Sequence, residues 1–153
     1  MLRALHSRGY TIVVCTNESV DHLKNSAPLA ETLRVKCGRV ACWTEDVGVP
    51  VLALAATSKR TGFSNRGHSL HKQPRTAEGN AGMWDVAEEL LALEPGGGFG
   101  GGESFFVGDA AGREGDHGDD DRRLAASAGV RFWSETEFFE RDPLRLLQNV
   151  FTV

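Results

Sequence analysis

Residues able to do chemistry follow the apolar stretches of this sequence. They are Thr16 and Asn17, Thr57 with the basic segment that holds His71 and Lys72, Gly108 with Asp109, and the acidic run 116–121. Because ligands of an open α/β sheet bind beyond the carboxyl ends of its strands, we expect these residues to share one edge. A hydroxyl, a cation and carboxylates at one edge suit a phosphoryl group and a magnesium ion.

The apolar stretches themselves have the character of buried β-strands. Strands are expected at 10–15, 49–56 and 104–107, with a shorter one at 130–133, and helix-like segments separate them. Strands that are apolar throughout are buried on both faces, and their alternation with helices indicates right-handed βαβ units and a parallel sheet. The sequence therefore predicts an α/β fold.

Three segments carry helix signals. Leu2, Leu5 and the following Gly9 predict a short amphipathic helix. The apolar stripe of residues 82–93 predicts a longer helix. Ser134 and Glu137 form a capping-box pattern, which predicts a short helix that closes the domain.

Composition limits the class of protein. The 153 residues carry 17 Lys+Arg against 21 Asp+Glu, as expected for one globular domain over residues 1–153. No apolar run approaches the roughly 20 residues of a membrane helix, so a membrane partner is not expected. The three Cys do not suggest a disulfide framework. Two surface loops are expected, the basic segment 59–75 and the glycine-rich insertion 95–102.

Several motifs together resemble one family. They are Ser104-Phe-Phe-Val-Gly-Asp-Ala-Ala-Gly-Arg113, the pair Asp121-Arg122, Glu137-Phe-Phe139, Gly82-Met-Trp-Asp85 and Thr16-Asn17. In this order they closely resemble the polynucleotide kinase 3'-phosphatases, whose phosphatase domains belong to the haloacid dehalogenase superfamily. The resemblance implies a Rossmann-like, three-layer parallel sheet.

The resemblance also implies roles for individual residues. In the family an aspartate attacks the terminal phosphate, forming an aspartyl-phosphate, while a second aspartate two residues later acts as acid and base and Mg2+ bridges them. The implied catalytic residues are Thr16, Asn17 and Lys72, the implied metal ligand is Asp109, and the implied substrate-binding residues are Arg113, Asp121 and Arg122. Aligning on Pro74 places Gln73 at the lysine position, whereas a shift of one residue keeps Lys72, which we favour because the role needs a cation.

One part of the family pattern is absent. No Asp-x-Asp-Gly-Thr motif, which carries the nucleophile, occurs in the sequence. We therefore expect a chain that is incomplete at its N-terminus and lacks its first central strand, with a diverged pseudophosphatase or completion by another chain as alternatives. No phosphatase turnover is expected from these residues alone.

The leading hypothesis is a Mg2+-dependent DNA 3'-phosphatase of strand-break repair, acting on DNA with 3'-phosphate ends, with DNA-repair proteins as partners. The expected location is the nucleus, with the mitochondrion as the alternative. A non-catalytic module that binds DNA ends or proteins, and a haloacid dehalogenase phosphatase for small molecules, are the other hypotheses. No GxxxxGK[ST] phosphate loop is present, so no 5'-kinase activity is expected from these residues.

Overall fold

The computed structural model describes residues 1–17, 26–56, 83–94 and 104–140. These residues belong to two units, Met1–His71 and Lys72–Val153, and each unit is described by itself. The predicted basic segment 59–75 and the glycine-rich segment 95–102, together with Thr57, Lys72 and Gln73, lie outside the described residues.

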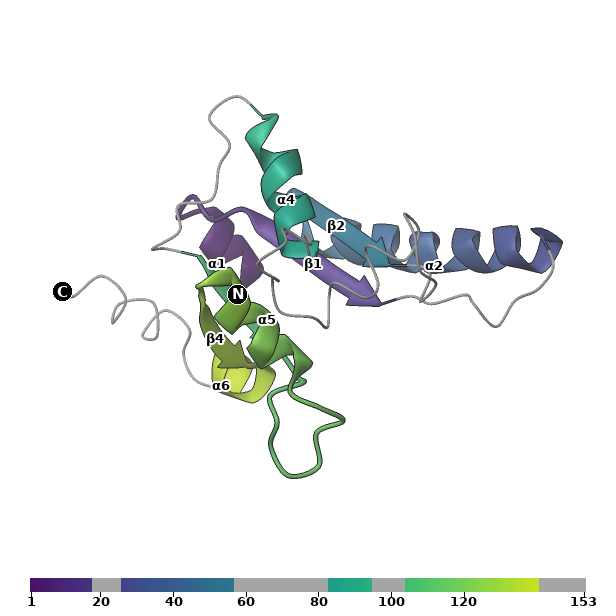
Figure 1. The fold of residues 1–153 in the computed structure, drawn as a ribbon. Coiled ribbons are helices and arrows are strands. Elements are labelled where there is room, and N and C mark those ends of the chain that lie inside the picture. The colour runs from purple at the N-terminus through teal and green to yellow at the C-terminus, as the bar shows by residue number, and fades with distance from the viewer. Residues whose placement is uncertain (18–25, 57–82, 95–103, 141–153) are drawn as a thin grey trace. The chain divides into compact units, whose positions relative to one another are not determined.

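The first unit contains a parallel pair of strands. Its elements are α1 (Leu2–His6), β1 (Ile12–Asn17), α2 (Ser26–Val47) and β2 (Val51–Ala56). The strands β1 and β2 pair in parallel from Ile12 opposite Val51 to Asn17 opposite Ala56, and Figure 1 shows the two arrows side by side. Parallel neighbours need a crossover connection, and α2 lies in that connection. The predicted α1 and the parallel pairing are thus confirmed.

The end of α2 is tied to α1 by one side chain. Arg3 donates hydrogen bonds from Nε to the carbonyl oxygen of Val47 (2.7 Å) and from Nη2 to that of Asp46 (3.1 Å). The last carbonyls of a helix lack partners within it, and a cation there also interacts favourably with the helix dipole. Gly48, with φ of 67°, then takes the left-handed conformation that commonly ends a helix. Together these residues set where β2 can begin.

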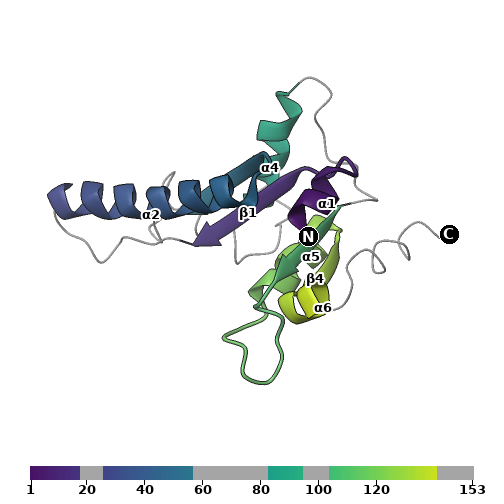
Figure 2. The same cartoon turned by 180° about the vertical axis from the view of Figure 1, so that it is seen from behind.

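The second unit contains a second parallel pair. Its elements are α4 (Met83–Ala92), β3 (Phe105–Gly108), α5 (Asp120–Ala128), β4 (Arg131–Ser134) and α6 (Glu135–Glu140). The strands β3 and β4 pair in parallel from Phe105 opposite Arg131 to Gly108 opposite Ser134. Both α5 and α6 contact both strands, and Figure 2 shows α5, α6 and β4 gathered together from behind.

Apolar side chains hold the second unit together. The most buried ones in β4, α5 and α6 are Leu124, Ala125, Trp133 and Phe138. The ring centroids of Phe105 and Phe138 lie 5.5 Å apart, which packs β3 against α6. Burial of these residues explains why the short strands and helices persist, since none would be stable alone.

The predicted capping box is present at the start of α6. The amide of Glu137 donates to Ser134 Oγ (3.2 Å), and the amide of Ser134 donates to Glu137 Oε2 (3.1 Å). The Ser134 hydroxyl also donates to Glu137 Oε2 (2.9 Å). This reciprocal pairing satisfies amides that a helix start leaves unpaired. It fixes α6 directly at the end of β4.

The predicted helix at 82–93 is confirmed as α4 (Met83–Ala92). Met83, Trp84 and Ala87 are buried, so Trp84 is a core residue. Its indole Nε1 donates to Glu88 Oε1 at 2.7 Å, four residues later on the same helix face.

The α/β class predicted from the sequence is confirmed. The described strands form two parallel pairs, β1 with β2 and β3 with β4. A three-layer sheet, and a first central strand within it, stay predictions. Among the helices that the structure describes, none combines the length and the apolar character needed to cross a membrane.

Candidate functional site

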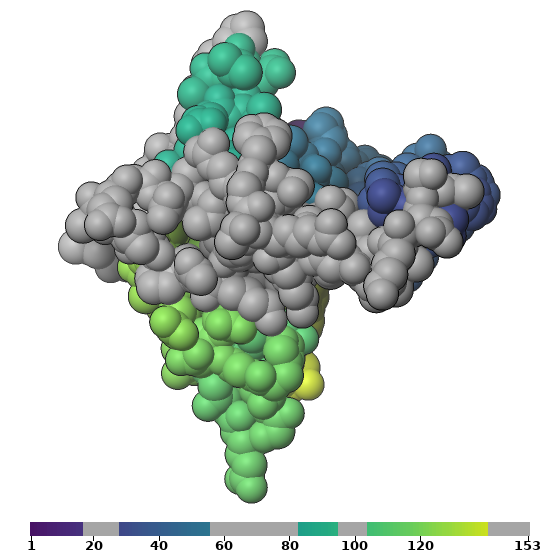
Figure 3. Space-filling view, turned by 45° about the vertical axis from the view of Figure 1, so that its right-hand side comes forward, coloured from purple at the N-terminus to yellow at the C-terminus, as the bar shows by residue number. Residues whose placement is uncertain are grey.

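The candidate site is centred on Asp109, which follows β3. Asp109 is exposed, and it lies at the carboxyl end of β3, beside the carboxyl end of the parallel strand β4. Ligand sites of α/β sheets lie at such ends. The loop after Asp109 runs to α5, and Figure 3 shows its tip, in green, protruding from the surface.

The residue after Asp109 is held from both sides by the start of α5. The amide of Ala110 donates to Asp121 Oδ2 at 3.0 Å. The carbonyl oxygen of Ala110 accepts from the amides of Asp121 (3.2 Å) and Arg122 (3.3 Å). The Asp121 side chain is buried, with 6% of the residue exposed. Because a buried carboxylate needs hydrogen-bond donors, this arrangement fixes the backbone next to Asp109.

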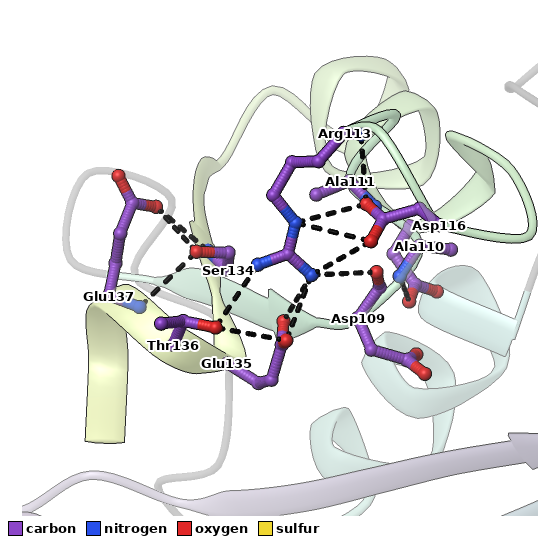
Figure 4. Close-up of polar contacts among 10 residues, drawn as sticks. Asp109, Ala110, Ala111, Arg113, Asp116, Ser134, Glu135, Thr136 and Glu137 are labelled. Carbon is purple, nitrogen blue, oxygen red and sulfur yellow. Dashed lines mark hydrogen bonds and ion pairs between the residues drawn. The ribbon is translucent and has the colours of Figure 1, made fainter. Parts of the chain in front are cut away.

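The loop is closed by a second carboxylate, that of Asp116. Its Oδ2 accepts hydrogen bonds from the amides of Ala111 (3.0 Å) and Arg113 (2.9 Å). The Arg113 side chain also donates to it, through Nε to Oδ2 (3.1 Å) and through Nη2 to Oδ1 (3.0 Å), as Figure 4 shows. The pKa of Asp116 is lowered to about 2, first by the Arg113 side chain and then by the backbone amides.

Arg113 reaches beyond its own loop to α6. Its Nη2 donates to Glu135 Oε1 (2.8 Å) and Oε2 (3.0 Å), and its Nη1 donates to Thr136 Oγ1 (3.2 Å). The same Nη2 donates to the carbonyl oxygen of Asp109 at 3.2 Å. The pKa of Arg113 is raised by Asp116 and then by Glu135, and the pKa of Glu135 is lowered chiefly by Arg113. Figure 4 shows the guanidinium between these partners.

The structure thus groups several residues that the sequence singled out. Asp109, Arg113 and Asp116 belong to one loop, and Asp121 and Arg122 belong to the first turns of the helix that follows. Arg122 is exposed, and its guanidinium carbon lies 5.8 Å from the ring centroid of Phe132. This distance is within the range of a cation–π contact, and the exposed guanidinium is accessible to an anion.

Thr16 and Asn17 lie in the first unit. They end β1, where Thr16 is opposite Ala55 and Asn17 is opposite Ala56 of β2. The residue Thr16 is half-buried. The strand-end position predicted for both residues is therefore confirmed, while their catalytic roles, like that of Lys72, stay predictions.

Glu135 and Thr136 were not predicted as members of the site. They follow β4 directly, and the only local signal near them is the Ser134 to Glu137 capping box. Their contact with Arg113 spans 22 residues in the case of Glu135. A local sequence pattern therefore cannot predict this contact.

The site offers one side chain that could be a ligand of a magnesium ion. In the described part of the chain, no group of three His, Cys, Asp or Glu side chains could hold a metal ion. Mg2+ is commonly held by one or two carboxylates together with phosphate and water oxygens, and the exposed carboxylate of Asp109 supplies one. The residues present therefore fit a part of such a site.

An exposed aspartate at the carboxyl end of a parallel strand, on a loop fixed by carboxylates, is placed where α/β proteins bind their ligands. The sequence profile of the family described as Polynucleotide kinase 3 phosphatase matches residues 1–139. The chain belongs to this family, and the predicted family is confirmed.

Three curated proteins are similar to the chain, and two of them are named as polynucleotide phosphatases. The chain is 35% identical over 144 residues to the Polynucleotide 3'-phosphatase ZDP of Arabidopsis thaliana, covering 90% of this chain and 19% of that protein. It is 28% identical over 140 residues to the bifunctional polynucleotide phosphatase/kinase of Schizosaccharomyces pombe, covering 90% of this chain and 28% of that protein. An uncharacterized 20.8 kDa protein of Autographa californica nuclear polyhedrosis virus is 28% identical, with 92% and 68% covered.

The chain thus spans about a fifth of the plant protein and under a third of the yeast protein. No solved structure matches it significantly.

Proposed function

We propose that this chain is the phosphatase part of a DNA 3'-phosphatase, which removes the phosphate from 3' ends of DNA. The observation that supports this most is the ordered loop that presents Asp109 at the end of β3, within a chain of the 3'-phosphatase family. The relatives named as polynucleotide phosphatases make 3'-phosphorylated DNA the substrate to test first.

In the proposed reaction a carboxylate attacks the phosphorus atom. The bond between phosphorus and the 3' oxygen of the DNA breaks, and an acid protonates that oxygen to give a 3' hydroxyl. Water then hydrolyses the aspartyl-phosphate to the free carboxylate and inorganic phosphate. This chain contains no Asp-x-Asp-Gly-Thr motif, so nucleophile and acid come from outside these 153 residues. We further propose that they lie on the first central strand of a three-layer, haloacid dehalogenase-like sheet.

The residues of this chain bind and orient the phosphoryl group. Thr16 Oγ1 donates to a phosphoryl oxygen, and Asn17, the next residue at the end of β1, belongs to the same catalytic group. Lys72 neutralises the charge that develops during transfer. Asp109 holds a Mg2+ ion, which supplies electrostatic stabilisation of the phosphoryl oxygens when it is bound. Arg122, exposed on α5, contacts the DNA backbone. Asp121 contributes to substrate binding indirectly, because its carboxylate fixes the loop after Asp109.

The proposed setting is repair of DNA strand breaks, with repair proteins as partners. The nucleus is the proposed location and the mitochondrion the alternative. A second candidate function is a non-catalytic module that binds DNA ends, and it is favoured by one observation, the absence of the Asp-x-Asp-Gly-Thr motif from the sequence.

The test begins with the mass of the endogenous protein and the reading frame that encodes it. The protein isolated from its cells is then assayed with a 3'-phosphorylated oligonucleotide and with a small phosphate ester, each with and without Mg2+. Release of phosphate from the oligonucleotide that needs Mg2+ supports the proposal. Binding of the oligonucleotide without any release, in a protein that lacks the motif, overturns it in favour of the binding module.

A further inference from the structure

We propose that Arg113 is a positioning residue, which with Glu135 as its anchor holds the loop that presents Asp109, rather than a residue that contacts substrate. This inference rests on the proposed phosphatase function. It assigns Glu135, a residue outside the motifs of the family resemblance, to the same site.

The first argument is that the donors of Arg113 are already engaged. Its Nε faces Asp116 at 3.1 Å, its Nη1 faces Thr136 at 3.2 Å, and its Nη2 faces Glu135 at 2.8 Å. A guanidinium binds phosphate through two parallel N–H donors on one edge. In Arg113 one edge faces the Asp116 carboxylate, and the other faces the Glu135 carboxylate and the Thr136 hydroxyl. A phosphate would have to displace these partners.

The second argument is where the partners of Arg113 lie. Asp109 follows the end of β3, and Glu135 follows the end of β4, the parallel neighbour of β3. Nη2 bridges the two, because it donates to the Asp109 carbonyl oxygen and to the Glu135 carboxylate. The guanidinium therefore joins the backbone of Asp109 to the neighbouring strand end, as Figure 4 shows.

The third argument is that the anchor is itself fixed. Glu135 is the first residue of α6, and the Ser134 to Glu137 capping box holds that helix start against β4. The residue after Asp109 is held independently by Asp121. Asp109 thus sits between two supports, and loss of the Arg113 support shifts its carboxylate without unfolding the loop.

Because Arg113 and Glu135 carry opposite charges, substitutions of the two residues distinguish a positioning role of Arg113 from substrate contact. If Arg113 contacted a DNA phosphate, Arg113→Ala would weaken substrate binding, whereas Glu135→Gln would strengthen it by removing a repelling charge. If Arg113 positions Asp109, both variants lower turnover, and neither changes binding much. A displacement of about 1 Å at a reacting group lowers the rate by about 100-fold. We therefore expect kcat to fall between about 10-fold and 100-fold.

The structural half of the test uses the 153-residue chain. Amide hydrogen exchange is compared in the wild type, Arg113→Ala, Arg113→Lys and Glu135→Gln, with Arg123→Ala as the control. Arg123 is an exposed arginine on α5, and its Nη1 lies 3.9 Å from the carboxylate of Asp119. Faster exchange at the Ala111 amide in Arg113→Ala and Glu135→Gln, but not in Arg123→Ala, supports the inference. Unchanged exchange there overturns it.

The kinetic half uses the enzyme isolated from its cells and a 3'-phosphorylated oligonucleotide. Lower kcat with KM within about twofold in Arg113→Ala and Glu135→Gln, partial rescue in Arg113→Lys and no further loss in the double variant support positioning. A raised KM in Arg113→Ala with a lowered KM in Glu135→Gln overturns it. If the wild type releases no phosphate, the proposed function fails, and hydrogen exchange still decides whether Arg113 holds the loop.

Discussion

Gly108 and Asp121 lie in direct contact. A Cβ atom built on Gly108 would come within 2.6 Å of the Cβ of Asp121, closer than real side-chain contacts allow. The end of β3 therefore needs glycine, because Asp121 must reach past it to accept the amide of Ala110. This contact couples the last residue of β3 to the first turn of α5.

Gly108→Ala should lower the stability of the second unit. The new methyl group has to displace the buried Asp121, so a loss of about 1–3 kcal/mol is expected, typical of an overpacked site. Thermal unfolding followed by circular dichroism measures it. The control is Gly38→Ala in α2, where a Cβ meets nothing within 4 Å and alanine favours the helix. An unchanged Tm for Gly108→Ala would show that the contact with Asp121 is not tight.

The capping box of α6 offers a second test. Ser134→Ala removes the acceptor for the Glu137 amide, and Glu137→Gln removes the charge that faces the Ser134 amide. Each should cost about 1 kcal/mol, and the two losses should not add, since they concern one interaction. Urea unfolding of both single variants and the double variant measures the coupling. The matched control is Glu140→Gln at the exposed end of α6, and equal losses in Glu140→Gln and Glu137→Gln would contradict the prediction.

Acid should weaken the second unit in a defined range of pH. The pKa of Asp116 is lowered to about 2 by Arg113, so its contribution is complete above the ordinary aspartate pKa, near 4, and is lost as pH falls through about 2. The lowered pKa of Glu135 acts in the same direction. Urea unfolding between pH 6 and pH 2, read from a probe in this unit, should show falling stability below about pH 4.

Asp116→Asn serves as the comparison for this pH series. The amide oxygen of asparagine still accepts hydrogen bonds from Ala111 and Arg113, but it carries no charge to lose. The variant should start from a lower stability near pH 6 and depend less on pH. A variant whose pH dependence equals that of the wild type would assign the acid sensitivity to other carboxylates.

The local elements of the second unit were predictable from the sequence because their signals are local. Phe105 to Val107 reads as a buried strand through its apolar side chains, and Ser134 with Glu137 reads as a helix start through its spacing. The long helix α2 was expected only as a helix-like connection. No strong apolar stripe marks α2 in the sequence, and none of its residues with described burial is buried.

The contacts within the site were only partly predictable. The strand-end positions of Asp109 and Thr16 follow from the parallel pairing, which the order of elements indicates. The burial of Asp121 and the contact between Arg113 and Glu135 depend on how α5 and α6 contact the strands. These contacts join residues far apart in the chain, and a single sequence carries no signal for them.

The end of α2 gives a prediction for the first unit. Arg3→Ala removes both hydrogen bonds to the Asp46 and Val47 carbonyl oxygens and a favourable charge at a helix C-terminus. A loss of about 0.5–1 kcal/mol and faster amide exchange at Gly48 are expected. Arg8→Ala is the control, because Arg8 Nη1 donates at 3.2 Å to the carbonyl oxygen of Ala4, within the same short segment and not on α2. Equal effects of the two substitutions would show that the loss of stability comes from removing a positive charge and not from losing the hydrogen bonds to α2.

Asp109→Asn should abolish phosphatase turnover in the enzyme isolated from its cells while leaving the fold intact. Asp109 is exposed, and its backbone rather than its carboxylate is held by Arg113, so the change to an amide should leave Tm within about 1 °C. The metal assignment requires the charge, because Mg2+ strongly prefers carboxylate oxygen. Phosphate release at increasing Mg2+ concentration, together with Tm, measures both effects. Asp119→Asn is the control, another exposed aspartate, at the N-cap of α5, whose side chain makes no capping hydrogen bond. Normal turnover of Asp109→Asn would exclude Asp109 as the metal ligand, whereas equal losses in both variants would trace the effect to the charge of the loop instead of to Asp109.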